Sequence, residues 1–141
     1  MAQSAGYSGT PLPKKLGLKD GQRAAFLNLP DDHADLREAA QFASLETVAS
    51  PGDELDFVHM FTRIRAELED GLPKLKRAIR PTGMIWVSWP KKASKVPTDI
   101  TEDTIREIAL PIGLVDVKVC AVDPVWSGLK LMIPRDQRAL N

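Results

Sequence analysis

The sequence has few of the residues that build covalent or metal-bound frameworks. Cys120 is the only cysteine among 141 residues, which excludes an intramolecular disulfide and a multi-cysteine zinc site, so we expect no metal. No segment approaches the roughly 18 apolar residues of a membrane span. The first residues, MAQSAGYSG, lack the basic start and apolar stretch of a secretory signal. These absences predict a cytoplasmic protein without a membrane partner.

An excess of charge of either sign is also missing. Lysine plus arginine and aspartate plus glutamate number 19 each, so the formal net charge is zero. Proteins dedicated to binding nucleic acid usually carry a basic excess. We therefore expect no nucleic-acid partner, although a local basic patch is compatible with this balance.

The G-x-S-x-G motif of serine hydrolases is absent as well. Ser127 has no histidine beside it in the sequence, and no acidic partner for His59 is evident. The sequence therefore offers no spacing of nucleophile and base, which argues against a hydrolase.

The composition that is present suits one soluble domain with a core. Hydrophobic residues make up 43% of the chain and charged residues 27%. We divide the chain into an extended N-terminal arm (1–15), one domain (16–134) and a C-terminal tail (135–141). The arm is rich in glycine and proline, and we expect Tyr7 and Leu12 to pin it to the domain.

Apolar runs typical of strands alternate with helical patterns through the domain. Strands are predicted at 23–28, 44–49, 55–61, 84–89, 115–122 and 126–133. The run 55–61, LDFVHMF, is apolar on both alternations, as in a strand buried on both faces of a parallel sheet. A short turn joins the last two strands, so we expect them to pair antiparallel.

Three helices are predicted between these strands. The first begins at Asp31 or Asp32. The second carries an apolar stripe from 64 to 79, and its Gly71 and Pro73 predict a kink or a division into two short helices. The third is capped by Thr101. Alternating strands and helices predict an α/β three-layer sandwich with a mostly parallel sheet and a C-terminal antiparallel strand pair.

Two stretches carry a resemblance to a known fold. Residues 78–87, AIRPTGMIWV, resemble the helix–turn–strand signature in the second half of class I methyltransferases, and residues 112–117, IGLVDV, resemble the later helix–strand turn. The resemblance implies a Rossmann-like fold. Three longer stretches, GYSGTPLPKKLGLKDG, VSWPKKASKVPTDITED and VDVKVCAVDPVWSGLK, together resemble a bacterial family of short proteins of unknown function, which implies no catalytic residues.

The first predicted strand departs from the methyltransferase pattern. In that family the strand leads into a glycine-rich turn, which lets the backbone approach the cofactor. Here Asn28, Leu29 and Pro30 follow the strand, and Pro30 also lacks a backbone donor. Glu46 is the only weak candidate for an acidic residue that would hold a ribose. We therefore expect no cofactor, and in particular no S-adenosylmethionine or dinucleotide bound in the usual way.

A basic loop follows the predicted strand 84–89. Lys91, Lys92, Ser94 and Lys95 stand where open α/β sheets bind ligands, outside the carboxyl end of a strand. Three cations and a hydroxyl there predict a site for a small anion. The alternative interpretation is a solvated loop whose lysines aid solubility.

Three further residues are candidates for the same ligand side. His59 could act as a base or bond a ligand, but a core histidine bonded to a backbone carbonyl is the favoured interpretation. Asn28 and Trp89 end their strands on this side. By alternation Trp86 and Trp89 point to opposite faces, so they cannot form one stacking platform.

These observations leave three interpretations of function. The first is a non-catalytic Rossmann-like binding or regulatory module with an anion site at 89–95. The alternative is an atypical methyltransferase-like enzyme that acts on a small anionic substrate. The third is an interaction protein whose N-terminal arm reaches a partner or a second copy.

Overall fold

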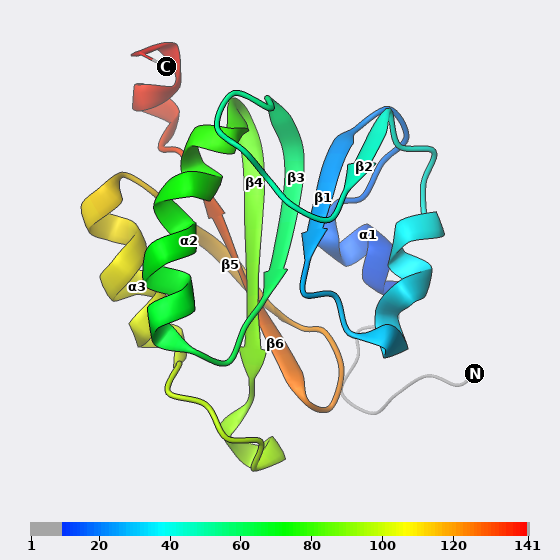
Figure 1. The fold of residues 1–141 in the computed structure, drawn as a ribbon, viewed down its shortest axis with the longest axis vertical. Helices are drawn as coiled ribbons and strands as arrows, with labels where there is room; N and C mark the ends of the chain where they lie inside the picture. The colour runs from blue at the N-terminus through cyan, green and yellow to red at the C-terminus, as the bar shows by residue number, and fades with distance from the viewer. Residues whose placement is uncertain (1–9, 141) are drawn as a thin grey trace.

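A six-stranded sheet forms the centre of the computed structural model, which describes residues 10–140 apart from the side chains of residues 139 and 140. The strand order is β2-β1-β3-β4-β6-β5 (Figure 1). The strands are β1 (Arg23–Leu27), β2 (Ser44–Glu46), β3 (Leu55–Phe61), β4 (Ile79–Pro90), β5 (Val115–Ala121) and β6 (Trp126–Met132). The first four strands pair in parallel, while β6 pairs antiparallel with both β4 and β5. The predicted α/β fold with a C-terminal antiparallel pair is confirmed.

Helices cover both faces of this sheet and make it the middle of three layers. Helices α2 (Arg65–Ala78) and α3 (Glu102–Ala109) pack on one face, and Figure 1 shows both in front of the sheet. Helix α1 (Leu12–Leu16) and the 3-10 helix η1 (Asp31–Glu38) contribute to a second, smaller core on the other face. Three short 3-10 helices complete the structure: η2 (Lys92–Ser94), η3 (Leu110–Ile112) and η4 (Arg135–Leu140).

Strand β3 has the bounds predicted from its apolar run. Phe57 belongs to the smaller core, whereas Val58 and Met60 belong to the core under α2 and α3. A strand with apolar side chains on both faces is stable only between two covering layers. This explains why the run LDFVHMF lies at the middle of the sheet.

The N-terminal segment differs from the expected extended arm. Residues 12–16 form α1, with Pro11 at its N-cap and Gly17 in the left-handed conformation at its end (φ 87°). Proline at a helix start has a suitable φ, and glycine adopts the left-handed cap without strain. Leu16 is fully buried, and its carbonyl accepts a hydrogen bond from Trp86 Nε1 at 2.8 Å. Tyr7 lies outside the described residues, so the pinning expected of it stays a prediction.

Two other helices differ from their predictions. The first is the 3-10 helix η1, interrupted by non-helical backbone at His33, and only its Leu36 is buried. The second, α2, runs unbroken through Gly71 and Pro73. Four of its apolar side chains are buried against the sheet, and this packing offsets the local cost of the two residues. Helix α3 begins with the predicted Thr101 cap, in a capping box with Thr104.

None of the helices within residues 10–140 is long and apolar enough to cross a membrane.

Two glycines offer a matched test of this packing. A Cβ at Gly83 would stand 2.7 Å from the Leu55 carbonyl oxygen, whereas a Cβ at Gly71 would meet only Met60, at 3.5 Å. We predict that Gly83→Ala lowers the free energy of unfolding by about 1–3 kcal/mol. Gly71→Ala, in a helix interior, should raise it by about 1 kcal/mol. Urea unfolding of both variants checks this, and equal effects of the two substitutions would contradict the packing described here.

Candidate functional site

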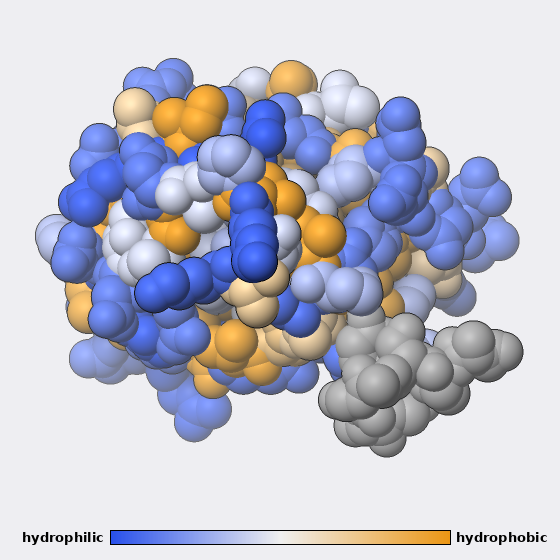
Figure 2. Space-filling view, turned by 90° about the horizontal axis from the view of Figure 1, so that it is seen from below, coloured by the Kyte–Doolittle hydropathy of each residue, from blue (hydrophilic) through white to orange (hydrophobic). Residues whose placement is uncertain are grey.

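The parallel strands bring their carboxyl ends to one edge of the sheet, which we call the carboxyl edge. Asn28 follows β1, Thr62 follows β3, Lys91 follows β4, and the turn 122–125 follows β5. Ligands of open α/β sheets bind at this edge. Figure 2 views the molecule from this side and shows apolar surface between hydrophilic side chains.

The first cavity at this edge lies between the ends of β1 and β3. There the strand order reverses, because β1 leads outward to β2 while β3 lies on its other side. The volume of this switch-point cavity is about 370 Å³. Its lining comprises Asn28, Pro30, Phe61, Thr62, Arg63, Ile64, Glu67 and Trp126.

Side chains of the protein itself cross this switch point. Asn28 is left-handed (φ 58°), and its Nδ2 donates to the Phe61 carbonyl at 3.1 Å and to Glu67 Oε1 at 3.5 Å. The Thr62 hydroxyl donates to the same Glu67 oxygen at 2.5 Å. These bonds tie the end of β1 to the end of β3 and to the first turn of α2.

The second and larger cavity lies at the basic loop after β4. Its volume is about 660 Å³, and we call it the lysine-loop cavity. The lining consists of Trp89, Pro90, Lys91, Lys92, Lys95, Val96, Pro97, Thr98, Ile100, Thr101, Glu102 and Ser127. Four of the residues predicted as ligand-side candidates are therefore together on one cavity wall. Trp89 is 7% exposed and belongs mainly to the core.

The charge of this cavity is positive. None of the ion pairs among the described residues uses Lys91, Lys92 or Lys95. Glu102 supplies the one carboxylate of the lining, and Arg106 forms an ion pair with it. Three cations without carboxylate partners therefore surround a mostly apolar cavity.

Ser94 has a different place from the one predicted. Its hydroxyl donates to the Lys91 carbonyl at 2.6 Å and accepts from the Val96 amide at 3.2 Å, and it is not among the residues that line the cavity. Thr98 likewise donates to the Arg63 carbonyl at 2.7 Å. Both hydroxyls shape the loop.

His59 is a core residue, as the favoured interpretation predicted, but its hydrogen-bond partner is a side chain. Its Nε2 lies 2.7 Å from the Ser88 hydroxyl, whereas a backbone carbonyl was expected. The imidazole is fully buried and stacks on Phe61, with ring centroids 4.2 Å apart. Burial, with a smaller contribution from His33, lowers the pKa of His59 from 6.5 to about 3. His59 is therefore neutral at physiological pH, and it lines neither cavity of the carboxyl edge.

A second histidine forms a pair that the sequence did not reveal. His33 Nε2 lies 2.7 Å from Asp123 Oδ2, and both side chains are largely buried. The other carboxylate oxygen accepts from the amides of Val125 and Trp126. Although burial opposes it, these amides and His33 hold the pKa of Asp123 below its usual value. Asp123 thus orients the imidazole, as an acid orients a general base.

The His33–Asp123 pair is linked to the lysine loop through the backbone. Val125, next in the turn after Asp123, accepts a hydrogen bond from the Lys91 amide at 2.7 Å. Ninety residues separate the two members of the pair, so only the fold brings them together. The sequence signal was limited to Asp123-Pro124, which marks a turn but no partner.

Comparison with solved structures finds the same fold in methyltransferases. A SAM dependent methyltransferase from Aquifex aeolicus is 18% identical, with a TM-score of 0.68 over 86% of this chain and 87% of the other. The ribosomal protein L11 methylase of Lactobacillus delbrueckii subsp. bulgaricus is 12% identical, with a TM-score of 0.53 over 86% and 74%. DhpI, in a complex with SAH, is 12% identical, with a TM-score of 0.55 over 83% and 78%. The fold of this chain is methyltransferase-like.

No protein-family model matches the chain, and no curated protein matches it in sequence.

The residues at the switch point do not fit S-adenosylmethionine in the usual way. A glycine turn would leave backbone amides open to the ligand. Here the Asn28 side chain spans the crevice to the Phe61 carbonyl, and Pro30 has no amide to offer. The helix that follows is the interrupted 3-10 helix η1. The switch point therefore lacks the open backbone donors that hold this cofactor in the usual way.

The buried His59 generates a prediction about pH. Its pKa is lowered in the folded state, so below 6.5 the unfolded chain binds a proton that the folded chain does not. The contribution of His59 to the free energy of unfolding should therefore be fully present above pH 6.5 and fall toward pH 3, by about 1.4 kcal/mol per pH unit. Urea unfolding at several pH values, compared with His59→Gln, isolates this effect because the amide cannot titrate. An identical pH dependence in the two proteins would exclude it.

Proposed function

We propose that this protein is an atypical enzyme on the methyltransferase-like fold, and that it acts on a small anionic substrate held in the lysine-loop cavity. The observation that carries the proposal is the set of three lysines without carboxylate partners around that cavity. A volume of about 660 Å³ is within the range of small-molecule sites.

The loop is suited to an anion in its geometry as well as its charge. Lys95 has a left-handed backbone (φ 62°), and the Ser94 hydroxyl bonds fix the turn before it. The ring of Pro90 restricts its own φ to about −65° at the end of β4. A loop that is already ordered loses less entropy when the ligand binds. Lysine binds a phosphate or carboxylate as a point charge.

The His33–Asp123 pair supports an enzyme over a non-catalytic module. An imidazole oriented by a carboxylate meets one requirement of a general base, and the pair lies at the carboxyl edge, although neither side chain lines the lysine-loop cavity. The Lys91–Val125 hydrogen bond connects the anion loop to the turn that carries Asp123. The fold shared with methyltransferases also favours an enzyme.

A non-catalytic binding module is the second candidate. Its supporting observation is the tie of Asn28 across the switch point, which fills the place where this fold usually holds a cofactor. The two candidates share the anion site. If the protein is an enzyme, His33→Gln should change the turnover of the bound anion. If it is a binding module, there is no turnover, and only binding of the anion can be measured.

The anion site is tested by Lys91→Ala combined with Lys92→Ala. Both lysine side chains are exposed or half-exposed and unpaired, so we predict a nearly unchanged melting temperature without ligand. The double variant should lose the stabilisation that phosphate or sulfate gives the parent protein at low ionic strength. Inert salt should weaken that stabilisation in the parent, because it screens exposed charges.

Lys74→Ala with Lys76→Ala is the control, since it removes the same charge from α2. If the parent shows no anion-dependent shift in melting temperature, or if both double variants lose it equally, the lysine-loop cavity does not bind anions.

A second test concerns S-adenosylmethionine. We predict no appreciable binding, because the Asn28 tie and Pro30 replace the glycine turn. Titration calorimetry measures this directly. Stoichiometric binding with a dissociation constant in the low micromolar range would contradict the prediction and restore the usual cofactor to this fold.

A further inference from the structure

A second basic surface lies on the other face of the sheet, where α1 and η1 leave β5 and β6 partly uncovered. Five lysines from different parts of the chain meet there, and we call them the lysine band: Lys14, Lys15, Lys19, Lys118 and Lys130. They belong to α1, the segment after it, β5 and β6.

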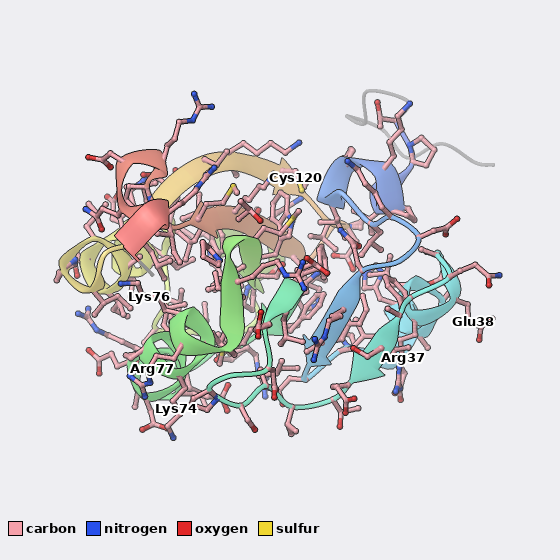
Figure 3. The ribbon with its side chains drawn as sticks, turned by 90° about the horizontal axis from the view of Figure 1, so that it is seen from above. Arg37, Glu38, Lys74, Lys76, Arg77 and Cys120 are labelled. Carbon is pink, nitrogen blue, oxygen red and sulfur yellow. The ribbon has the colours of Figure 1, made fainter. Side chains whose placement is uncertain are left out.

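Several observations place these lysines together. Lys118 and Lys130 are directly paired across β5 and β6. Lys14, Lys15 and Lys118 line a cavity of about 520 Å³ together with Cys120. Lys19 and Lys118 both act electrostatically on Lys130. Figure 3 shows Cys120 on the side of the sheet near α1, across from Lys74 and Lys76 on α2.

The band brings several positive charges together. None of the ion pairs among residues 10–140 uses Lys14, Lys19, Lys118 or Lys130. Lys130 is half-buried, and burial, together with Lys118 and Lys19, lowers its pKa. The mutual repulsion of these lysines costs folding free energy. A bound anion would offset that cost.

The arrangement of the band indicates what kind of anion would fit. A single phosphate carries only about two negative charges, so a chain of several phosphates balances five lysines better. Lysine lacks the fork geometry of arginine and suits phosphates as point charges. Trp86 lies beneath the band, 6.0 Å from Lys118 Nζ, but it is fully buried and offers no stacking surface to a base. Recognition would therefore rest on the phosphates alone.

We propose that the lysine band binds a compact chain of linked phosphates, either a free oligophosphate or the triphosphate of a nucleotide. This site is separate from the lysine-loop cavity, because Trp89 of that cavity packs in the core under α2 and α3 on the opposite face of the sheet. Burial raises the pKa of the Cys120 thiol, so Cys120 adds a neutral wall and no charge.

The test is titration of the full chain with tripolyphosphate at low ionic strength. Lys118→Ala with Lys130→Ala should weaken binding about tenfold, because two of the charge contacts are removed. Lys74→Ala with Lys76→Ala should change the affinity less than about twofold. A larger loss through Lys91→Ala with Lys92→Ala than through the band variant would place the binding in the lysine-loop cavity and overturn the proposal. Lys118→Arg with Lys130→Arg keeps both charges and should retain binding.

Further titrations distinguish between possible ligands. ATP with the same affinity as tripolyphosphate supports recognition of the phosphate chain alone. Absence of tripolyphosphate binding to the parent overturns the proposal, as does equal weakening by all three alanine pairs. Preference for a single-stranded oligonucleotide over tripolyphosphate overturns the proposal that the ligand is compact. If the lysine band does not bind phosphates, the proposed function still stands, because the Lys91 and Lys92 variants test the lysine-loop cavity separately.

Discussion

The structure depends on β3 being buried on both faces while it pairs in parallel with β1 and β4. This constraint sends the loops after all three strands to one edge of the sheet. The switch-point cavity and the lysine-loop cavity both exist because of it. The segment after β3 also joins the two cavities, since the Arg63 carbonyl accepts bonds from Thr98 and from the Asp99 amide while Arg63 itself lines the switch-point cavity.

Features set by neighbours in the sequence could be predicted. The bounds of β3, the Thr101 cap and the antiparallel pair β5–β6 each follow from a local pattern of apolar residues, caps or turns. Helix α1 was missed because Gly9, Pro11 and Pro13 suggest an extended arm, whereas two of those prolines stand where a helix begins. The unbroken α2 was missed because its packing against the sheet outweighs Gly71 and Pro73.

The same division applies to the candidate site. Lys91, Lys92 and Lys95 could be predicted because a loop after a strand is a local feature. Asn28 was placed on the ligand side, but its bond to Phe61 spans 33 residues and emerges only in the fold. His33 with Asp123, and the lysine band, join segments that no local pattern relates.

The neutral net charge does not describe how the cations are distributed over the surface. Acidic side chains pair with some of the cations of the α2–α3 face: Arg65 with Glu69, Lys74 with Asp70, and Arg106 with Glu102. None of the ion pairs among the described residues uses Lys91, Lys92 or Lys95 of the loop, or Lys14, Lys19, Lys118 or Lys130 of the band. In a chain with as many acids as bases, these lysines form two clusters, one at the carboxyl edge and one over β5 and β6. Solubility does not require lysines to be clustered, so the two clusters call for another explanation, and binding of anions supplies one.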